Sequence, residues 1–484
     1  MKRTRNLIIV AAVFVVLLAV IFAESKISEH IDSVTSTDEI ILALSVDDLT
    51  AVSWTYEEET LSFTSADGVW QDETDADFPV DADAMAEFLA NFAEIHSLFT
   101  ITDVEDYSQY GLDEPQCVVT LTVGEQTYTL NLGGYSTMDA QRYASLGGTT
   151  VYLLEDDLLE YITTDRDDFL QNDSLPAYDD FVSLSISGDV SLNAVYDAES
   201  VYSYTDDYNY YETSADYLTL DDATLENYVS LLDGLSFTDY ASYTASSVTL
   251  ADYGLENPAL TITVTGTVEP EEEDGEAETV AYTLNIGVVE VVTEEEADEE
   301  SENAEEAEPT YVYYLRVGES EMIYNLDSTT CEAIAACSYN DLRPTAVVSP
   351  DWDTLQSLSV TIGDESYEIS LALRSEIEEL EEDEEDETLY LLDSQEVDIS
   401  TLTAKIDALY IHSFVDEAAE KVLEMSFSLT LDRESYPTVS VEIYQYDSEN
   451  CLVYVDGQSV GLITRTMMVN LREAMTSLAL SIEE

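Results

Sequence analysis

"YGLDEP" occupies residues 110–115, and the nearly identical "YGLENP" occupies residues 253–258. A stretch written twice in one chain indicates that a whole structural unit has been duplicated. We predict that a single helical turn ends at Gly111, because glycine tolerates the left-handed conformation that closes a helix. Leu112 would then pack back on the turn. Pro115 would lead into a strand at a position that needs no backbone donor.

Both turns are assigned the same structural role, which is to redirect the chain from helix into sheet. The residues concerned are Tyr110, Gly111, Leu112 and Pro115 in the first copy and Tyr253, Gly254, Leu255 and Pro258 in the second.

An amphipathic helix precedes each of these turns, at residues 80–92 and 220–232. Apolar residues recur in both at helical spacing, and Asp81 and Asp221 are positioned to cap the first free amides. A third helix of the same kind, without the YGL turn, is expected over residues 397–409. The chain therefore contains three related units rather than two.

Segments that alternate apolar and polar residues surround each helix, as half-buried strands do. Glycine-containing breaks between them indicate hairpins. We predict an α+β fold of three tandem repeat units, each a mainly antiparallel sheet with packed helices. The units cover residues 45–175, 176–345 and 346–484.

The amino terminus carries Lys2, Arg3 and Arg5 before an uncharged apolar run at residues 7–23. As a helix this run spans about 25 Å, close to the thickness of a bilayer core. Basic residues ahead of it predict a cytoplasmic tip and a transmembrane signal anchor over residues 1–23, then a stalk over residues 24–44. The bulk of the chain would then lie outside a bacterial cell membrane that it crosses once. A cleaved signal peptide is the alternative.

The composition is strongly acidic, with 105 Asp and Glu against 14 Lys and Arg and a formal net charge of −91. This charge repels nucleic acid, which we exclude as a partner. Three acidic low-complexity stretches, beginning at Glu269, Glu294 and Glu376, interrupt predicted strands as hairpin insertions. We interpret these stretches as solvated loops, and weak association with divalent cations is the alternative interpretation.

No residue pattern in the chain points to a catalytic, cofactor or metal site. Asp75, Asp77, Asp81 and Asp83 are explained by helix capping and a solvated turn. His96 and His412 both occur in "IHS" at the end of a predicted helix, where a general base or a structural role is conceivable and repetition favours structure. The spacing of Cys331 and Cys337 leaves open a disulfide or two buried thiols.

One stretch is a candidate binding face, because seven tyrosines fall between residues 196 and 217. Tyrosine rings can stack on sugars or anchor a protein partner, and their hydroxyls form hydrogen bonds. Ordinary strand composition is the alternative explanation. The candidate residues are Tyr202, Tyr204, Tyr208, Tyr210 and Tyr211.

The chain resembles the bacterial domain-of-unknown-function 4340 family. The YGL turns carry the resemblance, together with "LNLGG" at residues 130–134, "TVYLLEDDLLEYI" at residues 150–162 and "LNIG" at residues 284–287. The resemblance implies an extracytoplasmic protein, often encoded beside ABC-transporter components of the type linked to gliding motility. It implies no catalytic residues.

These observations together predict a membrane-anchored extracytoplasmic binding or scaffolding protein without enzymatic activity, accessory to an ABC-type transport system. The alternatives are a cell-envelope enzyme acting on glycan or peptide and a protein whose acidic loops associate weakly with divalent cations. A cleft joining a histidine to a carboxylate pair would favour the enzyme.

Overall fold

The computed structural model describes residues 34–138, 140–214, 217–246, 249–270, 275–291, 309–376, 388–415 and 422–482. The chain divides into two compact units, Met1–Asp173 and Ser174–Glu484. The first unit contains one large antiparallel sheet, and the second contains two.

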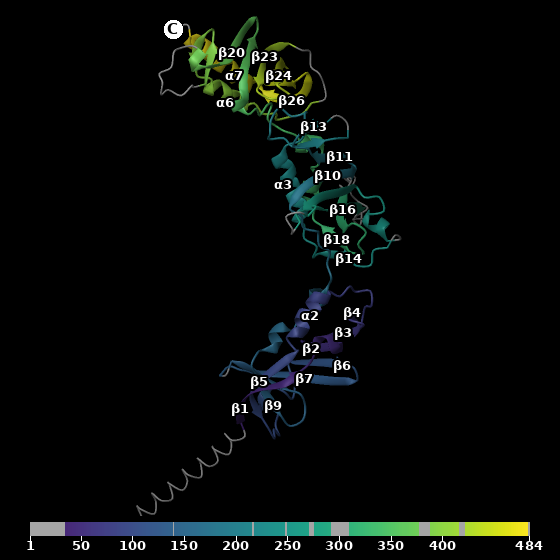
Figure 1. Ribbon diagram of the computed structural model, residues 1–484. Coiled ribbons are helices and arrows are strands. Elements are labelled where there is room, and N and C mark those ends of the chain that lie inside the picture. The colour runs from purple at the N-terminus through teal and green to yellow at the C-terminus, as the bar shows by residue number, and fades with distance from the viewer. Residues whose placement is uncertain are drawn as a thin grey trace, which may run out of the picture. The chain divides into compact units, whose positions relative to one another are not determined.

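The sheet of the first unit has nine strands in the order β1-β5-β9-β8-β7-β6-β2-β3-β4 (Figure 1). Helix α2 (Ala82–Ala90) joins its two halves along the chain. The strands are β1 (Val34–Ala43), β2 (Leu49–Tyr56), β3 (Glu59–Ala66), β4 (Val69–Asp72), β5 (Glu94–Ile101), β6 (Cys117–Val123), β7 (Gln126–Ser136), β8 (Gln141–Ser145) and β9 (Val151–Leu154).

The second sheet has nine strands in the order β13-β12-β11-β10-β15-β16-β17-β18-β14. Its helices are α3 (Asp222–Asp233), α4 (Ser328–Ala335) and α5 (Tyr339–Leu342). The strands are β10 (Asp180–Gly188), β11 (Leu192–Tyr196), β12 (Tyr210–Glu212), β13 (Leu218–Thr219), β14 (Tyr240–Ser242), β15 (Leu260–Val268), β16 (Glu278–Val291), β17 (Thr310–Val317) and β18 (Ile323–Leu326).

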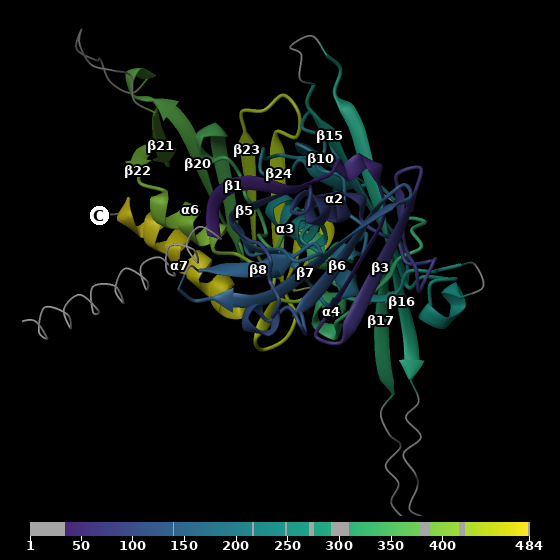
Figure 2. The same cartoon turned by 90° about the horizontal axis from the view of Figure 1, so that it is seen from below.

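The third sheet has eight strands in the order β22-β21-β20-β19-β23-β24-β25-β26. Helix α6 (Ser400–Asp407) lies beside the terminal helix α7 (Arg465–Ser481), as Figure 2 shows. The strands are β19 (Leu355–Ile362), β20 (Glu365–Leu373), β21 (Thr388–Leu392), β22 (Gln395–Val397), β23 (Leu423–Leu431), β24 (Thr438–Gln445), β25 (Asn450–Val455) and β26 (Gln458–Thr464).

The three sheets share one connectivity. In each, a meander of opening strands is followed by a helix, and the chain then returns to pair beside the first opening strand. Thus β6 pairs with β2, β15 with β10 and β23 with β19, all antiparallel. In each sheet the returning strand is itself the first of a further meander of four strands. Three copies of one chain path therefore build the described protein.

The helix between the two halves of each sheet buries the apolar face that the sequence predicts. Asp81 accepts hydrogen bonds from the amides of Asp83 and Ala84 at 2.8 and 2.9 Å, so it caps α2. Asp221 caps α3 in the same way. Buried side chains hold the three helices to their sheets: Met85, Phe88 and Leu89 of α2, Leu225, Tyr228, Val229 and Leu232 of α3, and Leu402 and Ile406 of α6.

The α+β fold class expected from the sequence is wrong, because the described chain is mostly antiparallel β-sheet. Its sheets contain nine, nine and eight strands, and most of its helices are short. Strands also form outside the predicted strand segments. Residues 94–101, in which His96 was expected at the end of a helix, form β5, and residues 34–43, assigned to a stalk, form the edge strand β1 paired with β5.

The predicted signal anchor over residues 1–23 lies outside the described residues. Within the part of the chain that the structure describes, no helix is long and apolar enough to cross a membrane.

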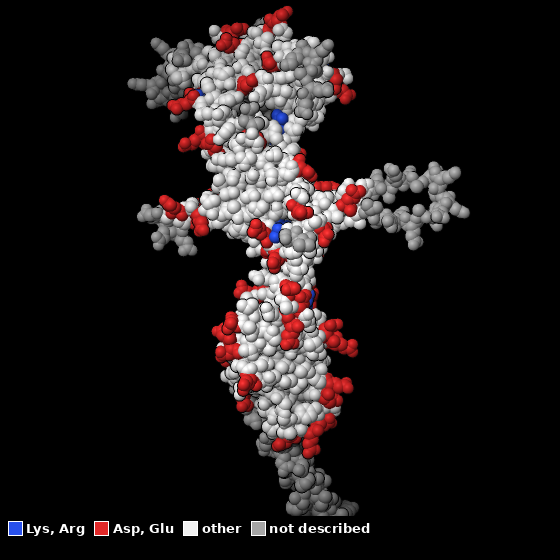
Figure 3. All heavy atoms as spheres, turned by 90° about the vertical axis from the view of Figure 1, so that its right-hand side faces the viewer, with Lys and Arg blue, Asp and Glu red and all other residues white. Residues whose placement is uncertain are grey.

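The acidic stretches connect neighbouring antiparallel strands, namely β15 with β16, β16 with β17 and β20 with β21. Most of their residues lie outside the described ranges. Elsewhere acidic side chains are scattered over the face seen in Figure 3, and basic ones are sparse.

Each YGL turn packs against a glycine in the second strand after it, which is β7 for the first turn and β16 for the second. Gly111 and Gly254 have φ values of 65° and 67°, the left-handed conformation that ends each short 3₁₀ turn. A Cβ on Gly133 would lie 2.5 Å from the Tyr110 carbonyl oxygen, and one on Gly287 would collide with the Tyr253 carbonyl oxygen. The turn and the "LNLGG" or "LNIG" strand are thus two halves of one packing contact.

The tyrosines of the two turns make matching ring contacts. Tyr110 meets Tyr143 edge to face with ring centroids 5.0 Å apart, and Tyr253 meets Tyr314 in the same way, also at 5.0 Å. Such edge-to-face pairs add stability beyond the area that they bury. These contacts give the repeated motif a structural role in both sheets.

Candidate functional site

The tyrosine-rich segment runs from the end of β11 to β13, and its side chains do not form one continuous face. Tyr202 is 52% exposed and Tyr204 is half-buried, whereas Tyr208, Tyr210 and Tyr211 are buried. Because neighbouring residues of a strand point to opposite sides, Tyr210 and Tyr211 of β12 serve different surroundings. The segment therefore contributes to two separate pockets of the second unit.

The first of these, here called the tyrosine groove, has a volume of about 710 Å³ and lies between the second and third sheets. Its aromatic lining combines the tyrosine-rich segment with α5 and with the turn between β23 and β24. The tyrosines that line it are Tyr202, Tyr204, Tyr208, Tyr217, Tyr339 and Tyr436.

A pair of stacked rings marks the most exposed part of the groove. Tyr202 and Tyr217 lie with ring centroids 4.8 Å apart and an interplanar angle of 28°. They are 52% and 43% exposed, respectively. Two stacked rings with this much open surface can offer a flat apolar face to a ligand.

Hydrogen bonds fix the inner part of the groove. The Tyr436 hydroxyl donates to Asp456 at 2.7 Å, and the Tyr204 hydroxyl accepts from the Ser349 amide at 3.3 Å. Burial raises the pKa of Tyr204 to about 12 and also raises the pKa of Tyr436. Both hydroxyls therefore stay protonated at neutral pH and keep a proton to donate.

Tyr436 has a left-handed backbone, with φ of 54°. A bulky residue in this conformation is an outlier that persists only where its surroundings hold it. The hydrogen bond to Asp456 and the ring contact with Tyr204, at 5.7 Å between centroids, supply that restraint. In this conformation Tyr436 lines the groove.

Arg343 contributes the single basic side chain of the groove lining. Its guanidinium lies over the rings of Tyr339 and Phe414, at 4.9 and 4.6 Å, and its Nη2 donates to the Val460 carbonyl at 3.1 Å. Its buried Nε has no hydrogen-bond partner within the described residues. Burial lowers the pKa of this guanidinium.

The loop that carries these tyrosines is tied to the third sheet. Asp206 forms an ion pair with Arg433 at 2.8 Å, and Asp207 accepts from the Ser349 hydroxyl at 3.0 Å. Groove geometry thus depends on contacts between residues more than a hundred positions apart.

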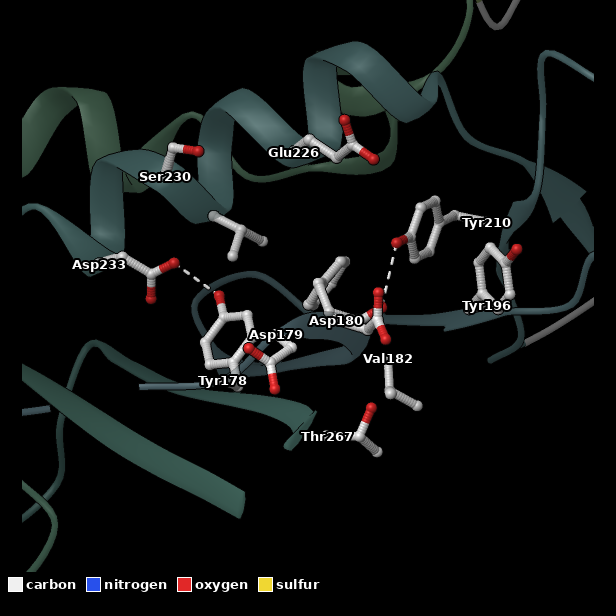
Figure 4. Close-up of a pocket in the computed structure, with 12 residues that line it drawn as sticks. Tyr178, Asp179, Asp180, Val182, Tyr196, Tyr210, Glu226, Ser230, Asp233 and Thr267 are labelled. Carbon is white, nitrogen blue, oxygen red and sulfur yellow. Dashed lines mark hydrogen bonds between the residues drawn. The ribbon is translucent and has the colours of Figure 1, made fainter. Parts of the chain in front are cut away.

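The second pocket, here called the acidic pocket, has a volume of about 740 Å³ and lies between α3 and the start of β10 (Figure 4). Glu226, Ser230 and Asp233 reach it from the helix, and Tyr210 and Tyr196 stand together at one end. The remaining lining residues are Tyr178, Asp179, Asp180, Phe181, Val182, Val229 and Thr267.

Tyrosine hydroxyls in the acidic pocket are engaged by the fold itself. Asp233 accepts from Tyr178 and from the neighbouring Tyr282, each at 2.5 Å. Tyr210 donates to the Phe181 carbonyl at 3.1 Å. Burial first, and then the hydrogen bond to Asp233, raises the pKa of Tyr178 and Tyr282. These hydroxyls join α3 to the sheet.

Neither His96 nor His412 lies at a helix end, and His412 stands between the bridge residues Tyr410 and Ser413. His96 lies in β5 and pairs with Glu94 at 2.8 Å. His412 pairs with Asn450 at 3.1 Å in a pocket of about 560 Å³ whose lining contains one carboxylate, Glu449. The carboxylate pair that an enzyme hypothesis requires is not among the described residues of that lining.

Asp75, Asp77, Asp81 and Asp83 lie around the start of α2. Asp75 forms an ion pair with Arg166 at 3.6 Å, and Asp81 is the helix cap. Throughout the described ranges, no group of three or more His, Cys, Asp or Glu side chains is placed to hold a metal ion.

All four cysteines are buried and free, so Cys331 and Cys337 are not joined in this structure. Burial raises the pKa of Cys117 and of Cys451 to about 11 and also raises that of Cys331 and Cys337. Thiols of this kind are poor nucleophiles at neutral pH.

Sequence reasoning missed half of the tyrosine groove. Tyr339, Arg343, Tyr436 and Asp456 come from segments far from the tyrosine-rich stretch, and only the packing of two sheets brings them together. The strained backbone of Tyr436 leaves no trace in the sequence. The sequence feature that could have pointed to this part of the groove is Arg343, because basic residues are scarce in the chain.

The model of one family, the Domain of unknown function (DUF4340), matches residues 70–241 and again residues 211–425. Each match contains one YGL turn with its partner glycine strand, and continues into the opening strands and helix of the next sheet. No curated protein and no solved structure matches the chain. Since the two matches together cover most of the chain, the protein belongs to the DUF4340 family.

Proposed function

We propose that this protein binds a ligand in the tyrosine groove and acts as a non-enzymatic binding or scaffolding protein on the outer side of a bacterial cell membrane. The groove is the observation that supports binding. It combines exposed stacked rings, a strained tyrosine and a partly buried arginine in one cavity.

The chemistry of the groove favours binding over catalysis. Among the described residues of its lining, none is a histidine, cysteine or lysine. Burial raises the pKa of Tyr204 to about 12 and also raises the pKa of Tyr436, so these two hydroxyls would be weak nucleophiles. Polar groups fixed in place around apolar rings are what a recognition site needs.

The proposed location rests on the sequence. Three basic residues precede the apolar run at residues 7–23, a pattern that favours retention of the amino terminus in the cytoplasm. The net charge of −91 suits a soluble body beside, rather than within, an anionic membrane surface. The resemblance on the YGL motifs supports a role accessory to an ABC-type transport system.

Photo-crosslinking tests whether the groove is a binding site. A photoreactive amino acid replaces Tyr202 in the full chain, expressed in its native membrane. The control replaces Tyr161, which is 45% exposed in the first unit and therefore similarly accessible. We expect a discrete, saturable adduct from position 202 and none from position 161. Equal labelling at both positions, or none at either, would contradict the proposal.

Purification after chemical crosslinking in the native membrane tests the accessory role separately. Recovery of ABC-transporter subunits with the full chain would support it. Their consistent absence under conditions that still give the position-202 adduct would refute the transport role and leave groove binding intact.

A further inference from the structure

We propose that the ligand of the tyrosine groove is a neutral glycan, which stacks a sugar ring on the Tyr202–Tyr217 pair and places its hydroxyls against Arg343, Asp456 and Gln458. This inference rests on the proposed function, because it takes the groove to be a ligand site. It goes further by assigning the class of ligand.

The ring pair provides an amphipathic platform. Tyr202 and Tyr217 stack on one another and keep about half of their surface open to solvent. The C–H face of a pyranose ring is flat and apolar, and its edge carries hydroxyls. Such a ring can cover an exposed aromatic face while its hydroxyls meet polar groups around it.

The polar part of the lining offers both donors and acceptors. Asp456 accepts from the Tyr436 hydroxyl through one oxygen and from the Ser440 amide and hydroxyl, each at 2.8 Å, through the other. These bonds fix the carboxylate, and each of its oxygens can accept more than one hydrogen bond. Gln458 and Arg343 add donors. A sugar hydroxyl both donates and accepts, so it needs this mixture.

The charge of the groove argues for a neutral ligand. Its lining contains one basic residue, Arg343, and one acidic residue, Asp456, so the two formal charges cancel. An anionic ligand would also meet the repulsion of a chain with a net charge of −91. A cationic ligand would find far more carboxylates elsewhere, in the acidic pocket among other places.

The size of the groove is compatible with a short oligosaccharide. Its volume of about 710 Å³ falls within the range of about 300–1,000 Å³ that is usual for small-molecule sites. The preformed ring stack and the restrained Tyr436 mean that little ordering is needed when a ligand enters.

A proline-rich segment is the competing occupant, because such segments also dock in aromatic-lined grooves. Proline lacks a backbone N–H and therefore offers acceptors but few donors. Such a ligand would add few donors to the three hydrogen bonds that the Asp456 carboxylate already accepts. The mixed lining favours a polyhydroxyl ligand over this alternative.

The first step of the test exposes the purified full chain, in detergent micelles, to a printed array of neutral and charged oligosaccharides and of proline-rich peptides. Titration calorimetry then measures the affinity for the best-bound neutral oligosaccharide. We expect selective binding of neutral oligosaccharides.

Variants locate the binding. Tyr202→Ala and Tyr217→Ala should each weaken the affinity about tenfold, which is the scale of one lost aromatic contact. Tyr202→Phe, which keeps the ring, should retain most of the affinity. Tyr161→Ala is the matched control and should change nothing. Thermal unfolding of each variant checks that it remains folded.

The outcomes separate the ligand class from the proposed function. The proposal that the ligand is a glycan is supported if the wild-type chain binds neutral oligosaccharides selectively and the Tyr202→Ala variant loses that binding. Binding of proline-rich peptides alone, or no array binding while the position-202 adduct persists, overturns the glycan and leaves groove binding standing. Loss of the position-202 adduct as well overturns both.

Discussion

The YGL turns and the tyrosine groove are both built around tyrosine, yet they use it differently. In the turns, Tyr110 and Tyr253 pack edge to face on partner rings, and their backbone carbonyls lie close against glycines. In the groove, Tyr202 and Tyr217 stack with much of their surface left open. The repeated element packs within the first and second sheets, whereas the element that occurs once leaves open the surface on which we propose that a ligand binds.

The comparison separates contacts that lie within one repeat from a groove that forms between two repeats. The first two copies share a turn docked on a glycine strand, which is a contact within the fold of each. The groove arises where two non-identical copies meet within the second unit, so no single repeat contains it. The expected consequences of substitution differ accordingly.

The largest effect is expected at the glycine strand. Gly287→Ala would drive a methyl group into the Tyr253 carbonyl oxygen, which is backbone and cannot move aside easily. We expect the free energy of unfolding to fall by about 3 kcal/mol or more. Urea unfolding of the purified chain measures it.

Gly318→Ala is the control for that substitution. Gly318 has φ of 50° and open space around its Cβ position, so alanine there meets only backbone strain. The expected loss is about 1 kcal/mol. Equal losses at the two positions would show that docking of the turn is not what the glycine provides.

A smaller effect is expected at the hydroxyl that joins the second sheet to α3. Tyr282→Phe keeps the buried ring but removes the hydrogen bond to Asp233. A hydrogen bond to a charged group contributes about 1.5–3 kcal/mol. Because Asp233 stays accessible to water, we expect a loss at the lower end of that range, measured by urea unfolding at pH 7.

The Tyr282 hydroxyl also makes the free energy of unfolding depend on pH in the alkaline range. Burial and Asp233 raise the pKa of Tyr282 above its ordinary value near 10, so the unfolded chain loses this proton first. Its contribution is complete below pH 10 and is lost as the pH rises further. Tyr282→Phe should therefore reduce the alkaline fall in unfolding free energy, by about 1.4 kcal/mol in total between pH 9 and pH 11. An unchanged slope between pH 9 and pH 11 would argue against this assignment.

The smallest effect on stability is expected at the mouth of the groove. Tyr202→Ala and Tyr217→Ala remove exposed rings, and each should change the free energy of unfolding by no more than about 0.5 kcal/mol. Thermal or urea unfolding checks this. A loss of several kcal/mol would mean that the pair serves the fold, as the YGL tyrosines do.

Local patterns predicted much of the architecture. The three amphipathic helices, the caps at Asp81 and Asp221 and the left-handed Gly111 follow from nearest-neighbour chemistry that a sequence displays. The predicted fold class was wrong because the number of residues in strands depends on which segments pair with one another in the sheets. Residues 34–43 look like a polar stalk until β5 supplies their partner.

The candidate site was less accessible to sequence reasoning. Clustering drew attention to the tyrosine-rich segment, but Tyr211 is a buried ring and Tyr210 faces the acidic pocket instead. Arg343 and Tyr436 join Tyr202 only through the packing of two sheets, which no local pattern encodes.

The most direct test of the central claim combines affinity and stability in one pair of variants. Calorimetric titration of a neutral oligosaccharide into the wild-type chain and the Tyr202→Ala variant, beside their unfolding free energies, separates the two uses of tyrosine. We predict that affinity falls about tenfold while stability is unchanged within about 0.5 kcal/mol. Unchanged affinity, or a loss of stability that accounts for the lost binding, would contradict the account.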